Sequence, residues 1–194
     1  MHQGTLVGII ALLGNFDRKG MLVPSSNLIR WGGLAAMAAG LAYVLEAIVF
    51  AVSPGGASQG VVSFIAVLLT AAGLVGFHAL QKENYGRIGR GGFYTAIVGA
   101  LVQAVAVLVS LLSEGGYLEG PLAATLFPIG FLVLMVGLII YGAATLQARV
   151  LPRWCGIGFI VFPLMAFVPW QHSSVISGLI FLALGYVLWS RGVQ

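Results

Sequence analysis

The chain has very few charged side chains. Lysine, arginine, aspartate and glutamate together make up 7% of its 194 residues, whereas hydrophobic residues make up 60%. A soluble globular domain carries about 25% charged residues. The composition therefore excludes an ordinary soluble protein and predicts an integral membrane protein. For the same reason, the net positive charge does not indicate nucleic-acid binding, because basic residues have a topological role in membrane proteins.

Cysteine and catalytic motifs are also scarce. Cys155 is the one cysteine, which excludes an intrachain disulfide and a cysteine-based metal cluster. The sequence has no H-E-x-x-H, G-x-S-x-G or P-loop pattern, and such patterns mark metalloproteases, hydrolases and nucleotide-binding enzymes. We therefore predict no catalytic residue, no metal site and no cofactor, and an enzyme is the least favoured class of function.

The chain does contain a series of apolar runs, several of them about 20 residues or longer. A run of about 20 residues crosses a hydrocarbon core of about 30 Å as a helix, and lipid favours helices because they satisfy their own backbone groups. The period-two alternation of a lipid-facing barrel is missing. We predict an all-α integral membrane protein with six transmembrane helices. The predicted spans are 27–52, 60–80, 92–112, 121–146, 154–168 and 174–189.

These spans define a single predicted domain. Residues 27–191 would form the six-helix domain, between an N-terminal extension (1–26) and a short C-terminal tail (192–194). The apolar stretch 5–13 is too short to span, and it has neither the preceding basic residues nor the cleavage site of a signal peptide. We expect the extension to be interfacial or disordered. The alternative is an extension upstream of a true start at Met21.

The basic residues predict the orientation of the helices. With six spans, all nine lysines and arginines fall on one side of the membrane, and the opposite loops contain none. Basic loops remain in the cytoplasm during insertion, so both termini are predicted to be cytoplasmic. The lipid bilayer is then the main partner of the chain.

Two of the predicted cytoplasmic connectors are similar. Segments 76–93 and 142–159 each end one apolar run, cross a short basic turn and begin the next run. The matching residues are Gly76, Leu80, Gln81, Arg87, Gly92 and Phe93 in the first segment and Gly142, Leu146, Gln147, Arg153, Gly158 and Phe159 in the second. The repeat suggests three tandem helical hairpins. The alternative is that these residue types recur at helix ends for topological reasons.

Short motifs at the helix ends resemble those of uncharacterised bacterial multipass membrane proteins, known only as domains of unknown function. The motifs are Arg30-Trp31-Gly32-Gly33, Ala79-Leu80-Gln81 followed by Tyr85-Gly86-Arg87, and Leu151-Pro152-Arg153-Trp154. The resemblance covers most of the six spans. It implies six helices in a bacterial cytoplasmic (inner) membrane and supplies no activity.

Small residues recur at a spacing of four in two of the spans. These stripes are Gly32, Ala36 and Gly40 in the first span, and Gly92, Ala96 and Ala100 in the third. Small side chains let helices approach closely in a membrane. We therefore expect both stripes to face other helices, and they would also suit a second copy of the chain or a partner membrane subunit.

Glu46 is the most informative polar residue. It lies about 24 Å from the inner end of its span, at 1.5 Å per residue, where a carboxylate costs at least about 2.5 kcal/mol. Tyr43 lies one turn below it, and Gln103 has a similar depth in the third span. We predict that Glu46 points into the bundle toward that span. It would form a proton-coupled or cation-binding site; the alternative is a neutral carboxyl that fastens two helices or meets water near the surface.

A second group of candidates lies near the cytoplasmic ends of the spans. His78 and Tyr141 could line a small pocket there, but an aromatic interfacial belt with one interfacial histidine is the favoured explanation. The predicted function is a carrier or binder of a small molecule, ion or lipophilic ligand centred on Glu46, with Gln103, Tyr43, His78 and Tyr141 as further candidate binding residues. The alternative is a non-catalytic structural or accessory subunit that packs partner helices.

Overall fold

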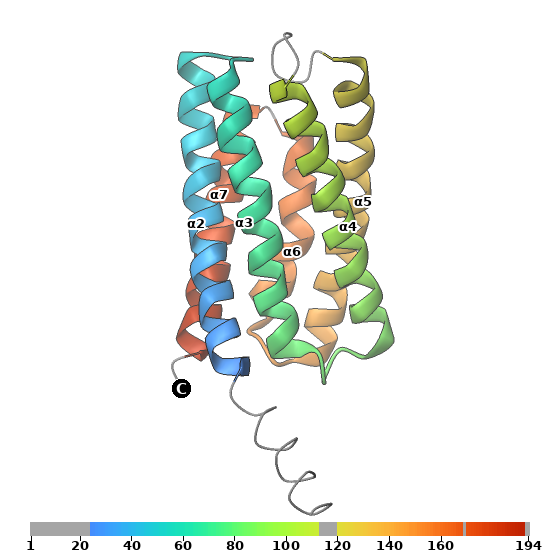
Figure 1. Ribbon diagram of the computed structural model, residues 1–194. Coiled ribbons are helices and arrows are strands. Elements are labelled where there is room, and N and C mark those ends of the chain that lie inside the picture. Colours follow the sequence, from blue (N-terminus) through green and yellow to red (C-terminus); the bar gives the residue numbers. More distant parts are fainter. Residues whose placement is uncertain (1–23, 113–119, 169, 193–194) are drawn as a thin grey trace, which may run out of the picture.

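The structure is a computed structural model that describes residues 24–112, 120–168 and 170–192, and Figure 1 shows a bundle of helices that run up and down. The elements in chain order are α2 (Pro24–Val52), α3 (Ala57–Gln81), α4 (Gly86–Leu112), α5 (Pro121–Ala148), α6 (Arg153–Leu164), the 3-10 helix η1 (Met165–Phe167) and α7 (Trp170–Arg191). The all-helical prediction is confirmed for the described residues.

Five of these helices are long and apolar enough to cross a membrane, namely α2, α3, α4, α5 and α7. The chain is therefore a multi-span helical membrane protein. Helix α6 differs, because its 12 residues extend only about 18 Å at 1.5 Å per residue. Pro163 lies in its last turn and supplies no backbone donor, and the chain continues as η1. The fifth predicted span (154–168) is thus a short helix rather than a full crossing.

Left-handed residues mark the turns that separate the helices. Gly55 has a φ of 75° between α2 and α3, and its N–H donates to the side-chain oxygen Oε1 of Gln59 at 2.8 Å. Gly86 has a φ of 63° at the first residue of α4, so this helix begins six residues before the predicted boundary at Gly92. The basic segment 87–91 continues the helix because nothing after Gly86 interrupts it.

The helices do not pack simply in chain order. The most extensive contacts join α4 to α5, and α2 to both α7 and α3. Helices α6 and α7 make few contacts although they are consecutive, so the third predicted hairpin is not a closely packed pair. The first and last described helices close the bundle instead. The internal duplication remains a prediction.

Both small-residue stripes lie at helix interfaces, as predicted. Ala36 and Ala96 are fully buried. A side chain at Gly40 would lie 2.6 Å from the carbonyl oxygen of Gly178 in α7, and one at Gly92 would lie 2.7 Å from the backbone nitrogen of Tyr141 in α5. The missing side chains therefore allow α2 to approach α7, and α4 to approach α5, at backbone distance.

The two ends of the bundle differ in charge. One end of the bundle holds the start of α2, the α3–α4 and α5–α6 turns and the end of α7 (Figure 1). We call it the basic end. It carries the described lysines and arginines, which are Arg30, Lys82, Arg87, Arg90, Arg149, Arg153 and Arg191. The opposite end, which we call the distal end, holds the α2–α3 turn and the starts of α5 and α7. That the basic end is cytoplasmic remains a prediction.

Some predictions concern residues that the structure does not describe. Most of the predicted N-terminal extension lies outside the described residues, because the description begins at residue 24. The same applies to most of the predicted loop before α5 and to the last two residues of the C-terminal tail.

Candidate functional site

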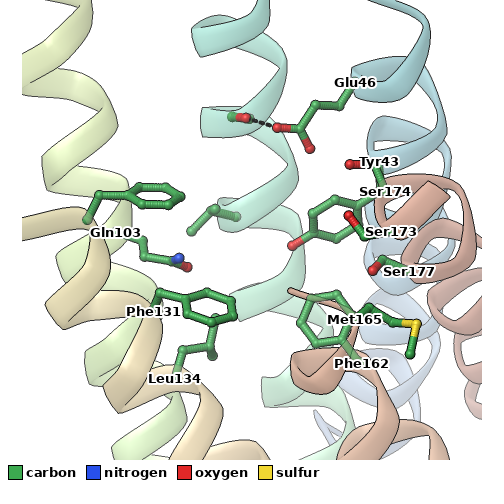
Figure 2. Close-up of a pocket in the computed structure, with 13 residues that line it drawn as sticks. Tyr43, Glu46, Gln103, Phe131, Leu134, Phe162, Met165, Ser173, Ser174 and Ser177 are labelled. Carbon is green, nitrogen blue, oxygen red and sulfur yellow. Dashed lines mark hydrogen bonds between the residues drawn. The ribbon is translucent and has the colours of Figure 1, made fainter. Parts of the chain in front are cut away.

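A cavity of about 180 Å³ lies inside the distal half of the bundle. Its polar lining comes from four helices and consists of Tyr43, Glu46, Ser63, Gln103, Ser173, Ser174 and Ser177. Its apolar lining consists of Val67, Phe127, Phe131, Leu134, Phe162 and Met165. Figure 2 shows these side chains converging on one space between the helices. A water occupies about 30 Å³ in the liquid, so the cavity has room for several waters or a small organic molecule.

Glu46 is held at the edge of this cavity by the helix that follows it. Its side chain is 4% exposed, and its Oε1 accepts a hydrogen bond from the hydroxyl of Ser63. Glu46 lies six residues before the end of α2 and Ser63 six residues after the start of α3. The tight α2–α3 turn therefore brings both to the same depth, about 9 Å from the distal helix ends at 1.5 Å per residue.

The prediction that Glu46 points into the bundle is confirmed, but its predicted direction is wrong. Ser63 of α3 is its hydrogen-bond partner, and no hydrogen bond to Gln103 is present in the described part of the chain. Figure 2 shows Gln103 entering the cavity from the side opposite Glu46. The reason is packing: α2 lies between α3 and α7, and its extensive contacts are with those two helices. Glu46 and Gln103 thus share a cavity and not a bond.

Tyr43 lines the cavity one turn below Glu46. Its hydroxyl lies 3.2 Å from the hydroxyl of Thr70 in α3. Its ring packs against Phe162 and Phe181, with centroid separations of 5.6 and 5.9 Å. These contacts hold the Tyr43 ring and its hydroxyl in place at the wall of the cavity.

Gln103 owes its place on the opposite wall to a close approach of α4 and α5. A side chain at Gly130 would lie 2.7 Å from the backbone nitrogen of Gln103, so the glycine lets α5 pass directly beside this residue. Gln103 itself is 4% exposed. Its amide can donate and accept hydrogen bonds, which adds a second kind of polar group to a cavity that already contains a carboxyl.

Sequence reasoning missed the serines that complete the polar lining. Ser173, Ser174 and Ser177 are buried in the first two turns of α7 and line the cavity together with Ser63. Their spacing was an available signal, because residues three and four apart share a helix face. The predicted sixth span began at residue 174, however, and Ser173 was assigned to the preceding turn.

Two prolines flank the aromatic walls. Pro128 lies inside α5, between the lining residues Phe127 and Phe131, and Pro163 lies between Phe162 and Met165. A proline within a helix lacks one backbone hydrogen bond and kinks or loosens the turn. Both prolines therefore lie beside the cavity, on helices that carry none of the three polar residues first singled out.

His78 and Tyr141 lie elsewhere, toward the basic end. His78 is hydrogen-bonded to the hydroxyl of Tyr85 and stacks on Phe93 with a centroid separation of 4.0 Å. Tyr141 is fully buried and its hydroxyl accepts a hydrogen bond of 3.0 Å from the amide nitrogen of Gln81. These side chains form a packed aromatic cluster, so they do not share the cavity with Glu46, Gln103 and Tyr43.

The cavity has a definite chemical character. Among the described residues that line it, Glu46 is the one acid, and neither lysine, arginine nor histidine contributes. No cluster of three or more histidine, cysteine, aspartate or glutamate side chains occurs within residues 24–112, 120–168 and 170–192. The geometry therefore offers one carboxyl, several hydroxyls and an amide inside aromatic walls. Such a mixture of apolar walls and a few convergent polar groups is typical of small-molecule sites.

Comparison with known protein families, curated proteins and solved structures gives no match for the chain.

Proposed function

We propose that the protein is a membrane-embedded binder or carrier of a small lipophilic organic cation, which it holds in the cavity beside Glu46. The observation that carries the proposal is the coincidence of a cavity of about 180 Å³ with a buried carboxyl. An acidic side chain within a membrane span is costly and is typically retained for a ligand, ion or proton pathway. A cavity beside that side chain is what such a role requires.

The sign of the ligand's charge follows from the lining. Glu46 can supply a negative charge, and no basic side chain among the described lining residues opposes it. Tyr43, Phe127, Phe131 and Phe162 add aromatic rings, whose faces attract cations. An anion would meet no positively charged side chain among the described lining residues, so the cavity favours an ammonium group.

The other lining residues favour a ligand with an apolar body. Val67, Leu134 and Met165 border the space together with the aromatic rings. The serines of α7 and Gln103 could orient a hydroxyl or amide on the same molecule. A hydrated metal cation fits less well, because hard cations take six or more oxygen ligands and much of this lining is apolar.

The alternative function, a structural subunit that packs partner helices, has lost part of its support. That reading relied on the two small-residue stripes as docking faces. Gly40 lies against α7 and Gly92 against α5, so both stripes are occupied within the chain. The cavity, by contrast, has no role in a purely structural subunit.

The test uses one cation and its neutral isostere. Purified protein in detergent would be titrated with benzyltrimethylammonium and, separately, with neopentylbenzene, which has the same shape without the charge. We expect the wild type to bind the cation more tightly. Glu46→Gln should weaken cation binding tenfold or more, a loss of about 1.4 kcal/mol, and leave neopentylbenzene binding almost unchanged.

Glu83→Gln is the matched control, because it removes the same charge from an exposed site on the α3–α4 turn. It should leave both affinities as in the wild type. Equal affinity for the two probes, or an equal loss of both in Glu46→Gln, would show that the carboxyl does not select a cation. No binding of either probe would overturn the proposal.

A further inference from the structure

A second hollow lies on the outside of the bundle, between α6 and α7. It is a groove of about 370 Å³ whose lining is apolar throughout, including Ile157 and Val161 of α6 and Ile176 and Ile180 of α7. It exists because these consecutive helices make few contacts with each other. Several of its lining side chains are exposed, such as Ile157 at 52% and Leu179 at 58%, so the groove opens outward.

The groove runs from the basic end toward the middle of the membrane. Its α6 wall extends from Trp154 to Val161, which is about 10 Å at 1.5 Å per residue. Gly158 forms part of its floor, since a side chain built there would meet Ile180 and Leu184 of α7 only at ordinary contact distances of 3.4 to 3.7 Å. The length of this wall and its apolar lining match the part of a lipid acyl chain that lies nearest the headgroup. They do not match a polar ligand.

Positive charge lies at the basic end of the same groove. Arg153 begins α6 and directly precedes Trp154. Arg191 ends α7 and lies near Cys155 at the start of α6. Both arginines are exposed. Basic residues between membrane helices at the headgroup level attract anionic lipids, and a tryptophan at this level is typical of the membrane interface.

We propose that the α6–α7 groove is a binding site for an anionic phospholipid. One acyl chain lies along Ile157, Val161 and Ile180, and the phosphate group is held by Arg153 and Arg191. The site is independent of the Glu46 cavity, because none of its lining residues borders that cavity. Charge selects the lipid, and the groove fixes the position of its chain.

The test separates these two contributions. The protein would be equilibrated with phosphatidylglycerol and phosphatidylcholine of identical chains, and retained lipid would be counted by native mass spectrometry. We expect phosphatidylglycerol to be preferred. Arg153→Gln and Arg191→Gln should each reduce that preference by about fivefold, as expected for one charge near a membrane surface, while Arg87→Gln on α4 should not.

Filling the groove should have a different effect. Gly158→Leu should reduce the retention of both lipids without changing their ratio. Gly91→Leu is its matched control, because it makes the same substitution near the basic end of α4, where the glycine has open space around it. The proposal is overturned if the arginine variants keep the wild-type preference, if Arg87→Gln lowers it equally, or if a second copy of the chain, and no lipid, is retained. Should Gly158→Leu fail to fold, the two arginine variants decide alone.

Discussion

Ser63 determines how well Glu46 is accommodated in the membrane. Its hydroxyl donates to Oε1 of Glu46, and both side chains are buried. Hydrogen bonds between membrane helices are worth about 0.6 kcal/mol on average. We expect Ser63→Ala to lower the free energy of unfolding by about 0.5–1.5 kcal/mol, measured by thermal or denaturant unfolding in one detergent.

The exposed Ser58, five residues earlier in α3, provides the control, and Ser58→Ala should leave the unfolding free energy unchanged. A double-mutant cycle of Ser63→Ala with Glu46→Gln gives the coupling directly. A coupling energy indistinguishable from zero would mean that the two groups do not stabilise each other.

Tyr85 gives a pH-dependent prediction at the same scale. It lies on the turn between α3 and α4, and burial raises its pKa from 10 to about 12; nearby Arg90 opposes this shift and Tyr94 adds to it. The folded protein therefore holds this proton more tightly than the unfolded chain does. The stability that the raised pKa of Tyr85 contributes is fully present below about pH 10. It is lost as the pH rises from about 10 to 12.

We expect Tyr85→Phe to remove part of the fall in Tm between pH 10 and 12, because a phenylalanine cannot ionise. Tm would be measured across this range for both proteins. A fall of the same size in Tyr85→Phe would show that other groups cause it.

At the scale of helices, glycine permits the close contact between α4 and α5. A side chain at Gly137 would collide with the backbone of Ala96 in α4. We expect Gly137→Ala to destabilise the protein by about 1–3 kcal/mol, the usual cost of overpacking, seen as a lower Tm. Gly91→Ala adds the same methyl group where nothing lies within 4 Å, and it should leave Tm unchanged. A similar Tm for both variants would place the α4–α5 contact at some other face.

The helices themselves were largely predictable from the sequence, because hydropathy and length report directly on burial in lipid. Burial of Glu46 could also be predicted, since a carboxylate facing hydrocarbon would be too costly. The hydrogen-bond partner of Glu46 could not be predicted. Ser63 looks like any tolerated serine in a span until one knows that α3, and not α4, lies beside α2. The pairing of α2 with α7 could not be predicted either, because no local sequence pattern indicates which distant helix packs against Gly33 or Gly40.

Helix α6 shows a different limit of sequence reasoning. An apolar run continues from Trp154 to Val168, and its hydropathy alone suggests a full crossing. The structure ends the α-helix at Leu164. The presence of Pro163 was visible in the sequence, but whether a proline kinks a helix or ends it depends on the tertiary packing around it.

At the scale of the whole molecule, the charge difference between the two ends predicts the orientation in the membrane. In a Cys155→Ala background, a cysteine at Ser58 should react with an impermeant maleimide added outside intact cells, because the α2–α3 turn lies at the distal end. A cysteine at Asn84, on the α3–α4 turn, should react only after the membrane is permeabilised. External labelling at Asn84 would reverse the proposed orientation.

The contact between α2 and α7 has a consequence for how the protein is made. Gly33 lies against Trp189, and Gly40 against Gly178, so the first described helix has its close partner almost at the other end of the chain. During translation α2 enters the membrane long before α7 leaves the ribosome. Its glycine face must then be covered by lipid or by the insertion machinery throughout synthesis, and the bundle can close only when the last helix arrives.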